Sequence, residues 1–226
     1  MGPKNEARNY TFAPNMQNKF PAENNIRNII FDLGGVILNI DYNLTSQAFK
    51  NLGLSDFDKK YSQAKQNHLF DKLETGEISA DDFSAQLMSY FSNSISPTEI
   101  EKAWNAMLLD LPVERIELLK KLSVKYRLFL LSNTNIIHYT AYSAYLQNTF
   151  GKMIFDDIFE KQYLSFEIGL RKPDKQLFEL VLNDNKLNPS ETLFIDDSIQ
   201  HIHGAVETGI VAYHLQQPET IIELFR

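Results

Sequence analysis

The amino-acid sequence predicts an α/β fold in which a parallel β-sheet carries an inserted helical segment. A short apolar run at residues 29–31 ends in a single carboxylate, Asp32, and has the length of a buried strand. From residue 43 to 109 the apolar residues recur at helical spacing, with no strand-like run between them. From residue 113 onward strand-like runs alternate with helical patterns. Such alternation is typical of parallel strands joined by helical crossovers.

Composition narrows the class of protein. The 226 residues are 43% hydrophobic and 23% charged, which is ordinary for a globular protein with one sizeable core and an insertion. The net charge of -7 argues against broad binding to nucleic acid or to an anionic membrane, because both require a basic face. The chain has no cysteine, no signal-peptide pattern and no apolar run near the roughly 18 residues of a membrane span. We therefore expect a cytoplasmic protein that binds neither nucleic acid nor membrane.

The same patterns predict the domain organisation. Residues 1–25 are rich in Asn, Pro and Lys, lack periodicity and are expected to form an N-terminal tail. Residues 43–109 are expected to form a small helical domain inserted after the first strand. Residues 26–42 and 110–226 are expected to form the α/β core.

Three capping-box spacings predict helix starts inside the insertion, and the first of them is Ser55 with Asp58. Ser79 and Asp82 have the spacing at which a serine and an acidic side chain cap each other's backbone. Ser96 and Glu99 repeat this spacing, with Pro97 at the first helical position, which proline favours. Each box precedes a segment with apolar residues on one helical face, so several short amphipathic helices are expected.

The core elements after the insertion follow from apolar periodicity and from turn and cap residues. Each predicted strand is short and apolar, and each predicted helix carries one apolar face. The expected elements are a helix at 113–124, a strand at 126–132, a helix at 135–148, a strand at 154–159, a helix after Pro173, a strand at 192–195, a helix from Ser198, a strand at 210–214 and a short C-terminal helix.

Polar side chains stand at the ends of three predicted strands. In parallel sheets these carboxyl ends share one edge, and ligands bind there. We therefore expect the polar groups to converge. They are Asp32 after the first strand, Ser132 and Asn133 after the second, and Asp196 and Asp197 after a third.

The converging groups suit metal-assisted phosphoryl chemistry. Three carboxylates at close range repel one another unless a cation lies among them or their pKa values rise. Hard oxygen ligands with room for water suit Mg²⁺. Lys172, just before a predicted helix, and the Ser132 hydroxyl supply donors for phosphoryl oxygens, and Asp32 could attack phosphorus. Taken singly, Ser132 could be a helix cap and Lys172 an exposed loop residue.

Histidines near these segments carry a weaker signal. His201 and His203 flank Ile202 after the paired aspartates, and we interpret them as residues of an exposed first helical turn, with a zinc site as the alternative. His138 is interpreted as a residue on a helix face, with orientation of a loop near the site as the alternative.

Four segments resemble, in order, the motifs of the haloacid dehalogenase-like (HAD) superfamily. They are FDLGGV at Asp32, LLSNT at Ser132, RKPD at Lys172 and FIDDS at Asp196 and Asp197. The helical insertion resembles a type-1 cap. The resemblance runs from about residue 27 to the C-terminus and implies a Rossmann-like three-layer core. FDLGGVILNID, LSNTN and GLRKPD further resemble the bacterial sugar-phosphatase branch typified by α-D-glucose-1-phosphate phosphatase.

The resemblance implies a phosphatase that hydrolyses small phosphorylated metabolites, with sugar phosphates as one class, and that uses Mg²⁺ as its cofactor. It also implies a role for each matching residue. Asp32 is the implied nucleophile and also a metal ligand. The metal is further bound by the backbone carbonyl of Gly34, directly by Asp197, and through a water by Asp196. Ser132 and the Asn133 amide hold the phosphoryl group, and Lys172 neutralises charge on the nucleophile and the phosphoryl group.

Gly34 departs from the family pattern. Most phosphatases of the family carry a second aspartate there as general acid and base, a role worth roughly 10² to 10⁴ in rate. Its absence leaves several interpretations: a leaving group that needs little protonation, a substitute acid such as Asp41, or a module that binds phosphometabolites without turnover. A phosphomutase or a dehalogenase of the same fold are further alternatives; the former needs the missing acid, and the latter does not need the paired aspartates.

Overall fold

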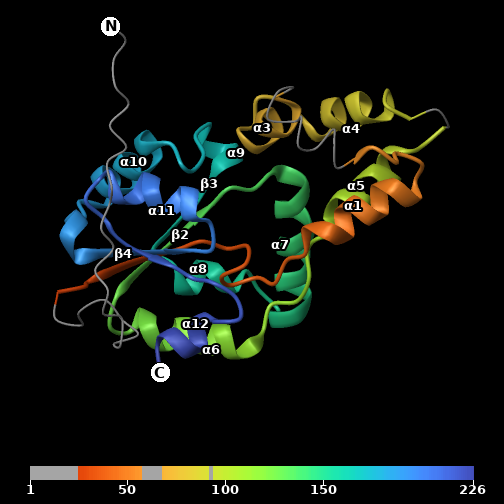
Figure 1. The fold of residues 1–226 in the computed structure, drawn as a ribbon. Helices are drawn as coiled ribbons and strands as arrows, with labels where there is room; N and C mark the ends of the chain where they lie inside the picture. The colour runs from red at the N-terminus through yellow and green to blue at the C-terminus, as the bar shows by residue number, and fades with distance from the viewer. Residues whose placement is uncertain (1–24, 58–67, 92–93) are drawn as a thin grey trace, which may run out of the picture.

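A five-stranded parallel sheet lies at the centre of the molecule (Figure 1). The computed structural model describes residues 25–57, 68–91 and 94–226, so nearly all of the predicted tail at residues 1–25 lies outside the described residues. The predicted three-layer α/β core is confirmed. In spatial order the strands are β3 (Lys161–Leu164), β2 (Arg127–Ser132), β1 (Asn28–Phe31), β4 (Thr192–Asp196) and β5 (Val211–His214).

The register of the sheet places two acidic strand ends side by side. β1 lies between β2 and β4, and Phe31 pairs with Leu130 on one side and with Ile195 on the other. Asp32 follows Phe31, and Asp196 follows Ile195. The Asp32 N–H donates to the Ile195 carbonyl at 3.0 Å and so extends the pairing by one residue. Both carboxylates therefore emerge at the edge where open α/β sheets bind ligands.

Helices cover both faces of the sheet, and strand side chains alternate between the faces. Ile29 and Phe31 lie in one apolar cluster and Ile30 lies in another, as the two-residue period of a strand requires. No helix in the described residues is long and apolar enough to cross a membrane. The apolar cluster that contains Ile29 and Phe31 also takes residues from α6 (Val113–Ser123), α7 (Ile136–Phe150), α8 (Ile154–Ile158) and α12 (Ile221–Leu224). The cluster that contains Ile30 takes residues from α10 (Lys175–Asn185) and α11 (Ile199–Val206).

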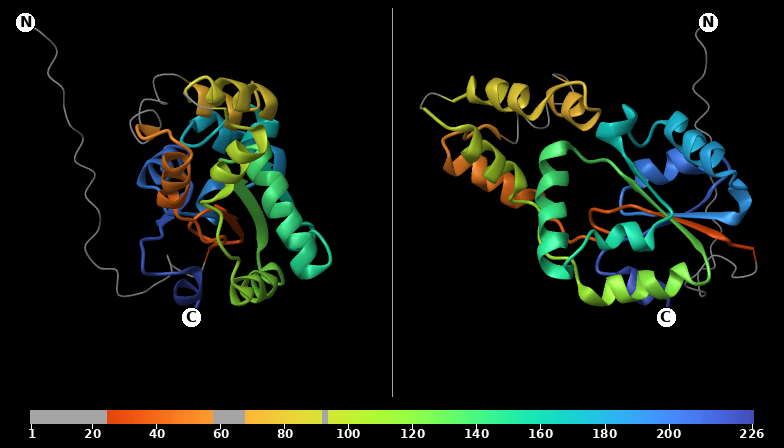
Figure 2. Two further views of the ribbon diagram at one scale, coloured as in Figure 1. Left: turned by 90° about the vertical axis from the view of Figure 1, so that its right-hand side faces the viewer. Right: turned by 180° about the vertical axis from the view of Figure 1, so that it is seen from behind.

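The described residues between β1 and α6 form helices with connecting turns, and they share an apolar cluster with Ile137 of α7. That cluster is built around the buried aromatic residues Phe49, Phe83 and Trp104. The capping boxes predicted at Ser79 and Ser96 are present at the starts of their helices, whereas the one predicted at Ser55 includes Asp58, which lies outside the described residues. Figure 2 shows these helices beyond the carboxyl ends of the strands; assignment of residues 43–109 to a separate domain stays a prediction. They are α1 (Tyr42–Asn51), α3 (Leu69–Glu74), α4 (Ala80–Met88) and α5 (Pro97–Asn105).

The predicted strand at 154–159 is wrong, because this segment forms α8 and the strand β3 comes after it. Ile154, Phe155 and Ile158 are buried on one face of a helical turn. Asp156 and Asp157 lie in the first turn, where the helix dipole favours carboxylates. The remaining core elements lie close to their expected positions. Two short helices that the sequence did not indicate are also present, α9 (Ser165–Ile168) and the 3₁₀ helix η1 (Pro189–Glu191).

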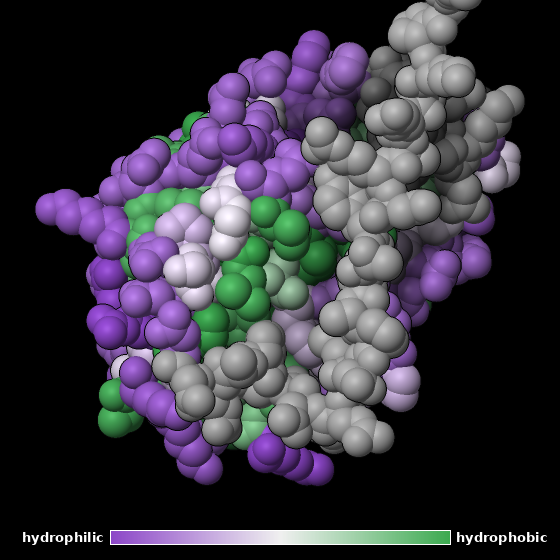
Figure 3. Space-filling view, turned by 60° about the vertical axis from the view of Figure 1, so that its left-hand side comes forward, coloured by the Kyte–Doolittle hydropathy of each residue, from purple (hydrophilic) through white to green (hydrophobic). Residues whose placement is uncertain are grey.

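The opposite edge of the sheet, where the strands begin, carries an open hollow of about 990 Å³. Figure 3 brings this side of the molecule forward and shows apolar surface framed by hydrophilic residues. Arg127 and Glu160 form an exposed ion pair among the lining residues. The acidic strand ends, with Asp32 and Asp196, lie at the other edge of the sheet.

Candidate active site

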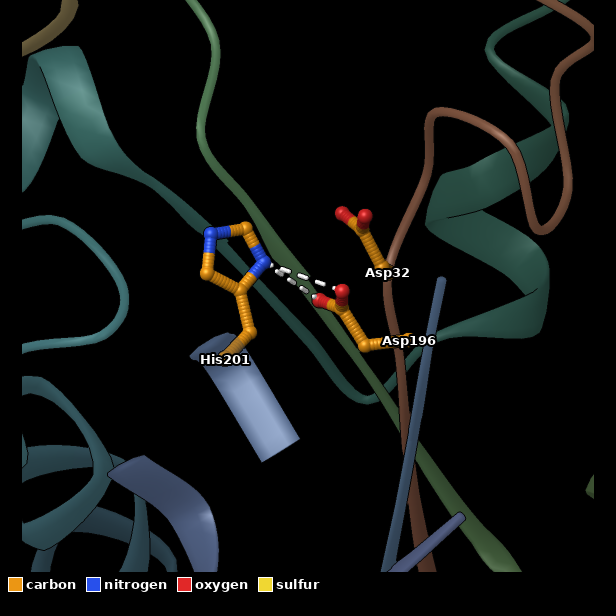
Figure 4. A group of neighbouring side chains, drawn as sticks. All are labelled: Asp32, Asp196 and His201. Carbon is orange, nitrogen blue, oxygen red and sulfur yellow. Dashed lines mark hydrogen bonds and ion pairs between the residues drawn. The ribbon is translucent and has the colours of Figure 1, made fainter. Parts of the chain in front are cut away.

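A buried lysine joins the two acidic strand ends. The Lys172 Nζ atom lies 2.8 Å from Asp32 Oδ1 and 2.7 Å from Asp196 Oδ2. The lysine side chain has no exposed surface. Figure 4 shows Asp32 and Asp196 side by side, with His201 reaching Asp196 from α11; potential ligand atoms of all three lie within 4.8 Å of one another. The sequence therefore correctly placed Asp32, Lys172 and Asp196 together.

The side chain of Asn133 positions this lysine. Its Oδ1 accepts a hydrogen bond from the Lys172 N–H at 2.8 Å, and its Nδ2 donates to the Lys172 carbonyl at 2.9 Å. Asn133 directly follows β2, so the central sheet holds the segment that precedes α10. Ser132, at the end of β2, is buried and lines the same cavity as Asp32. The roles of Ser132 and Asn133 toward a phosphoryl group stay predictions.

Asp196 is held by three donors. Besides Lys172, it accepts hydrogen bonds from the Ser198 N–H at 2.7 Å and from His201 Nδ1 at 2.9 Å. Burial raises the pKa of Asp196, but Lys172 and His201 outweigh it and hold the pKa well below its usual range. The interpretation of His201 as an exposed helix residue is wrong, because its side chain is mostly buried against this carboxylate.

The site holds more negative than positive charge. Burial raises the pKa of Asp32 to about 7 even though Lys172 lowers it, and Asp196 and Asp197 raise it further. Burial and Asp196 also raise the pKa of Asp197. Carboxylates disfavour ionisation in this way when a buried site lacks enough cationic partners. The oxygen-rich donor set and the surplus negative charge fit a hard divalent cation such as Mg²⁺.

Gly35 lets Asp197 approach the loop after β1. Its φ of 75° lies in the left-handed region, and a Cβ atom there would overlap Asp197 Oδ2. The glycine at this position is therefore required by both backbone conformation and close approach. It fixes where the Asp197 carboxylate sits relative to Asp32.

A cavity of about 630 Å³ opens in front of these groups. Asp32, Ser132 and Asp197 line it from the sheet edge, and Glu74 and Trp104 line it from the helical insertion. The cavity therefore lies between the two parts of the chain.

Arg171 links the core to the insertion beside this cavity. Its guanidinium forms an ion pair with Asp71 and lies 3.1 Å from Glu74, both on α3. The neighbouring residue in the chain is Lys172, so the segment that supplies the buried lysine also holds α3 against the cavity. Local sequence pattern does not reveal this pair, because the partners are about 100 positions apart.

His138 forms a second link between core and insertion. Its ring stacks on Trp104, and its Nε2 lies 3.1 Å from the Trp104 carbonyl. The Asn135 Nδ2 atom donates to His138 Nδ1 at 3.1 Å, so the proton of the ring lies on Nε2. Burial lowers the pKa of His138 to about 4, which keeps the ring neutral. The sequence interpretation of His138 as a helix-face residue omitted this contact.

Comparison with known proteins identifies similar chains along nearly the whole length. The family model described as haloacid dehalogenase-like hydrolase matches residues 26–209. D-ribitol-5-phosphate phosphatase from Bacteroides thetaiotaomicron is 35% identical over 194 residues, covering 86% of this chain and 92% of that protein.

Two similar solved structures support the fold, and one of them contains bound magnesium and phosphate. A HAD family enzyme from Bacteroides thetaiotaomicron, in complex with magnesium and inorganic phosphate, has 35% identity and a TM-score of 0.80, covering 89% of this chain and 100% of that one. A predicted HAD-like hydrolase from Porphyromonas gingivalis has 31% identity and a TM-score of 0.78, covering 89% and 98%. The similarity to the glucose-1-phosphate phosphatase branch stays a prediction.

We expect Gly35→Ala to weaken Mg²⁺ binding about tenfold or more, because the added methyl group displaces Asp197 Oδ2. Isothermal titration with MgCl₂ measures this. Gly151→Ala is the matched control, since Gly151 has a φ of 71° and no atom within 4 Å of the added Cβ. Both variants should lose about 1–2 kcal/mol of stability from the left-handed backbone. Equal Mg²⁺ affinity in the two variants would contradict the placement of Asp197.

Proposed function

The chain belongs to the haloacid dehalogenase-like hydrolases, and we propose that it is a Mg²⁺-dependent phosphatase of small phosphorylated metabolites. The observation that carries the proposal is the buried Lys172 between Asp32 and Asp196, beside a surplus of carboxylates. A phosphoryl group brings further negative charge and needs both a cation and hydrogen-bond donors. The magnesium and phosphate bound to the related enzyme support this interpretation.

The proposed reaction has two displacements at phosphorus. A carboxylate oxygen of Asp32 forms a bond to phosphorus while the bond from phosphorus to the ester oxygen breaks, which leaves an aspartyl-phosphate and releases the alcohol. Water then forms a bond to phosphorus while the bond to Asp32 breaks, releasing inorganic phosphate and restoring the carboxylate. Lys172 neutralises charge on Asp32 and on the phosphoryl oxygens, and Ser132 and Asn133 hold the phosphoryl group.

Asp32, the backbone carbonyl of Gly34 and Asp197 would hold Mg²⁺, with Asp196 acting through a water. The oxygens of Asp196 already accept bonds from Lys172 and His201, which supports Asp197 as the direct ligand. A bound Mg²⁺ would supply positive charge to the phosphoryl oxygens. The same charge would favour the ionised form of Asp32, whose pKa is otherwise raised to about 7.

We further propose that the substrates are sugar or polyol phosphates. The cavity of about 630 Å³ has room for a metabolite of this size and combines polar side chains with apolar walls such as Trp104. The relative named D-ribitol-5-phosphate phosphatase supports this class. A dehalogenase has no use for the charge surplus around Asp32 and Asp197, so this alternative is disfavoured.

We expect the wild-type protein to release phosphate selectively from sugar or polyol phosphates when Mg²⁺ is present. EDTA should stop the release and added Mg²⁺ should restore it. Asp32→Asn should lower turnover about 10³-fold or more, because loss of a nucleophile removes the covalent route. A phosphate-release assay over sugar, polyol, nucleotide and cofactor phosphates measures each result. Tight binding without turnover by the folded wild type would instead support a non-catalytic module.

We expect Asp41→Asn to leave turnover within about threefold, because a lost general acid costs far more. The Asp41 carboxylate caps α1, accepting from the Asn43 N–H at 2.9 Å, and does not line the cavity. Asparagine also caps helices, so the fold should persist. A hundredfold fall in kcat would show that Asp41 takes part in the chemistry.

A further inference from the structure

The proposed reaction leaves one proton without a donor. The ester oxygen that leaves phosphorus must gain a proton to depart as an alcohol, and Gly34 has no side chain to supply it. A Cβ atom at Gly34 would lie 3.1 Å from Ile40 Cδ1, so an apolar group occupies the space into which a side chain there would project. A proton donor supplied by the protein must therefore come from elsewhere in the cavity wall.

Most titratable groups that line the cavity are already engaged. His138 is hydrogen-bonded at both ring nitrogens, and His201 is paired with Asp196. Burial raises the pKa of Tyr142, so its phenol holds its proton far too tightly to act as an acid. His214 contacts the Asp197 carbonyl and Gln216. Among the described carboxylates that line the cavity, Asp32 and Asp197 have roles already, which leaves Glu74.

Glu74 has the environment of a proton donor. It is the last residue of α3, and its side chain is mostly buried. Arg171 Nη2 lies 3.1 Å from Glu74 Oε2 but is not oriented to donate, so this oxygen has no hydrogen-bond partner in the described residues. Burial raises the pKa of Glu74 to about 7, against the opposing effect of Lys172. A carboxyl group with a pKa near the working pH can both give and take a proton.

Contacts from the core fix Glu74 at the cavity. Arg171 pairs with Asp71, one helical turn before Glu74, so the guanidinium holds the end of α3. Gly76, just beyond the helix, has a φ of 70° and lies so close to the Phe166 carbonyl that a Cβ atom would overlap it. The turn that ends α3 is thus docked against α9. Within the part of the chain that the structure describes, the charged groups that face Glu74 are Arg171 and Lys172 from the core and Asp71 on its own helix.

We propose that Glu74 is the general acid and base of this site, in place of the side chain that Gly34 lacks. The proposal rests on the proposed phosphatase function. In the first displacement the Glu74 carboxyl group gives its proton to the ester oxygen as the bond to phosphorus breaks, so a neutral alcohol leaves. In the second displacement the Glu74 carboxylate takes a proton from the water that attacks phosphorus. Each turnover thus returns Glu74 to its protonated form.

The dependence on the leaving group tests this role. Glu74→Gln should lower kcat about 10²-fold or more for an alkyl phosphate such as D-ribitol 5-phosphate or glycerol phosphate. The ester oxygen of an alkyl phosphate is a poor leaving group unless it gains a proton and departs as an alcohol. The same variant should lose less than about threefold with 4-nitrophenyl phosphate, whose leaving group departs as a stable anion. Glu74→Asp, which keeps the carboxyl group on a shorter side chain, should fall between Glu74→Gln and the wild type with the alkyl ester.

Asp71→Asn is the matched control, since it removes the other α3 carboxylate that pairs with Arg171. Because Glu74 keeps its carboxyl group, this variant should slow the alkyl ester far less than Glu74→Gln does. Equal losses for both esters in Glu74→Gln would show that Glu74 only supports the structure of the cavity wall, and would overturn the proposal. A wild type that hydrolyses neither ester with Mg²⁺ would contradict the phosphatase function itself, a result distinct from selective failure at Glu74. Circular dichroism and thermal unfolding confirm that each variant is folded.

Discussion

The Lys172 ammonium group, with no exposed side-chain surface, lies within 2.8 Å of two carboxylates that come from different strands. Removing such charges from water costs several kcal/mol for each ion, and only close pairing offsets the cost. Asp32 and Asp196 can provide that pairing because β1 and β4 are adjacent and parallel, with their ends in register. The side chain of Asn133, which follows β2, forms two hydrogen bonds with the backbone of Lys172. Loss of Lys172 would leave two buried carboxylates without their shared cation, so the charge balance of the site depends on the order of the strands.

The carboxylates of the site outnumber their cationic partners, and this charge imbalance is the basis of the proposed chemistry. Asp197 adds a third carboxylate that Lys172 does not contact, and Gly35 lets it come close. Burial, together with the neighbouring carboxylates, raises the pKa values of Asp32 and Asp197. A divalent cation would correct the imbalance, and a phosphoryl group would then meet positive charge on two sides. The helical insertion lines the cavity and brings Glu74 to it, so in the proposed reaction the core would bind the phosphoryl group and the insertion would supply a proton.

The features that could be predicted from the sequence are those that depend on residues close together in the chain. Asp32, Ser132 and Asp196 could be assigned to one sheet edge because each ends an apolar run, and parallel pairing then brings the runs together. Capping boxes predicted helix starts for a similar local reason. The segment at 154–159 was misread because three apolar residues in five fit both a strand and one buried helical face. The roles of Arg171 and Glu74 could not be predicted, because their contact joins positions far apart in the chain and depends on how the insertion docks.

The central claim is that Asp32 forms a covalent bond to phosphorus. A substrate ester made chiral at phosphorus with oxygen isotopes tests it most directly, because each in-line displacement inverts the configuration. Two displacements, through an aspartyl-phosphate on Asp32, predict that the stereochemistry at phosphorus is retained when the phosphoryl group is transferred to an acceptor alcohol added in place of water. Inversion would mean that the acceptor attacks the ester directly and that Asp32 is not the nucleophile.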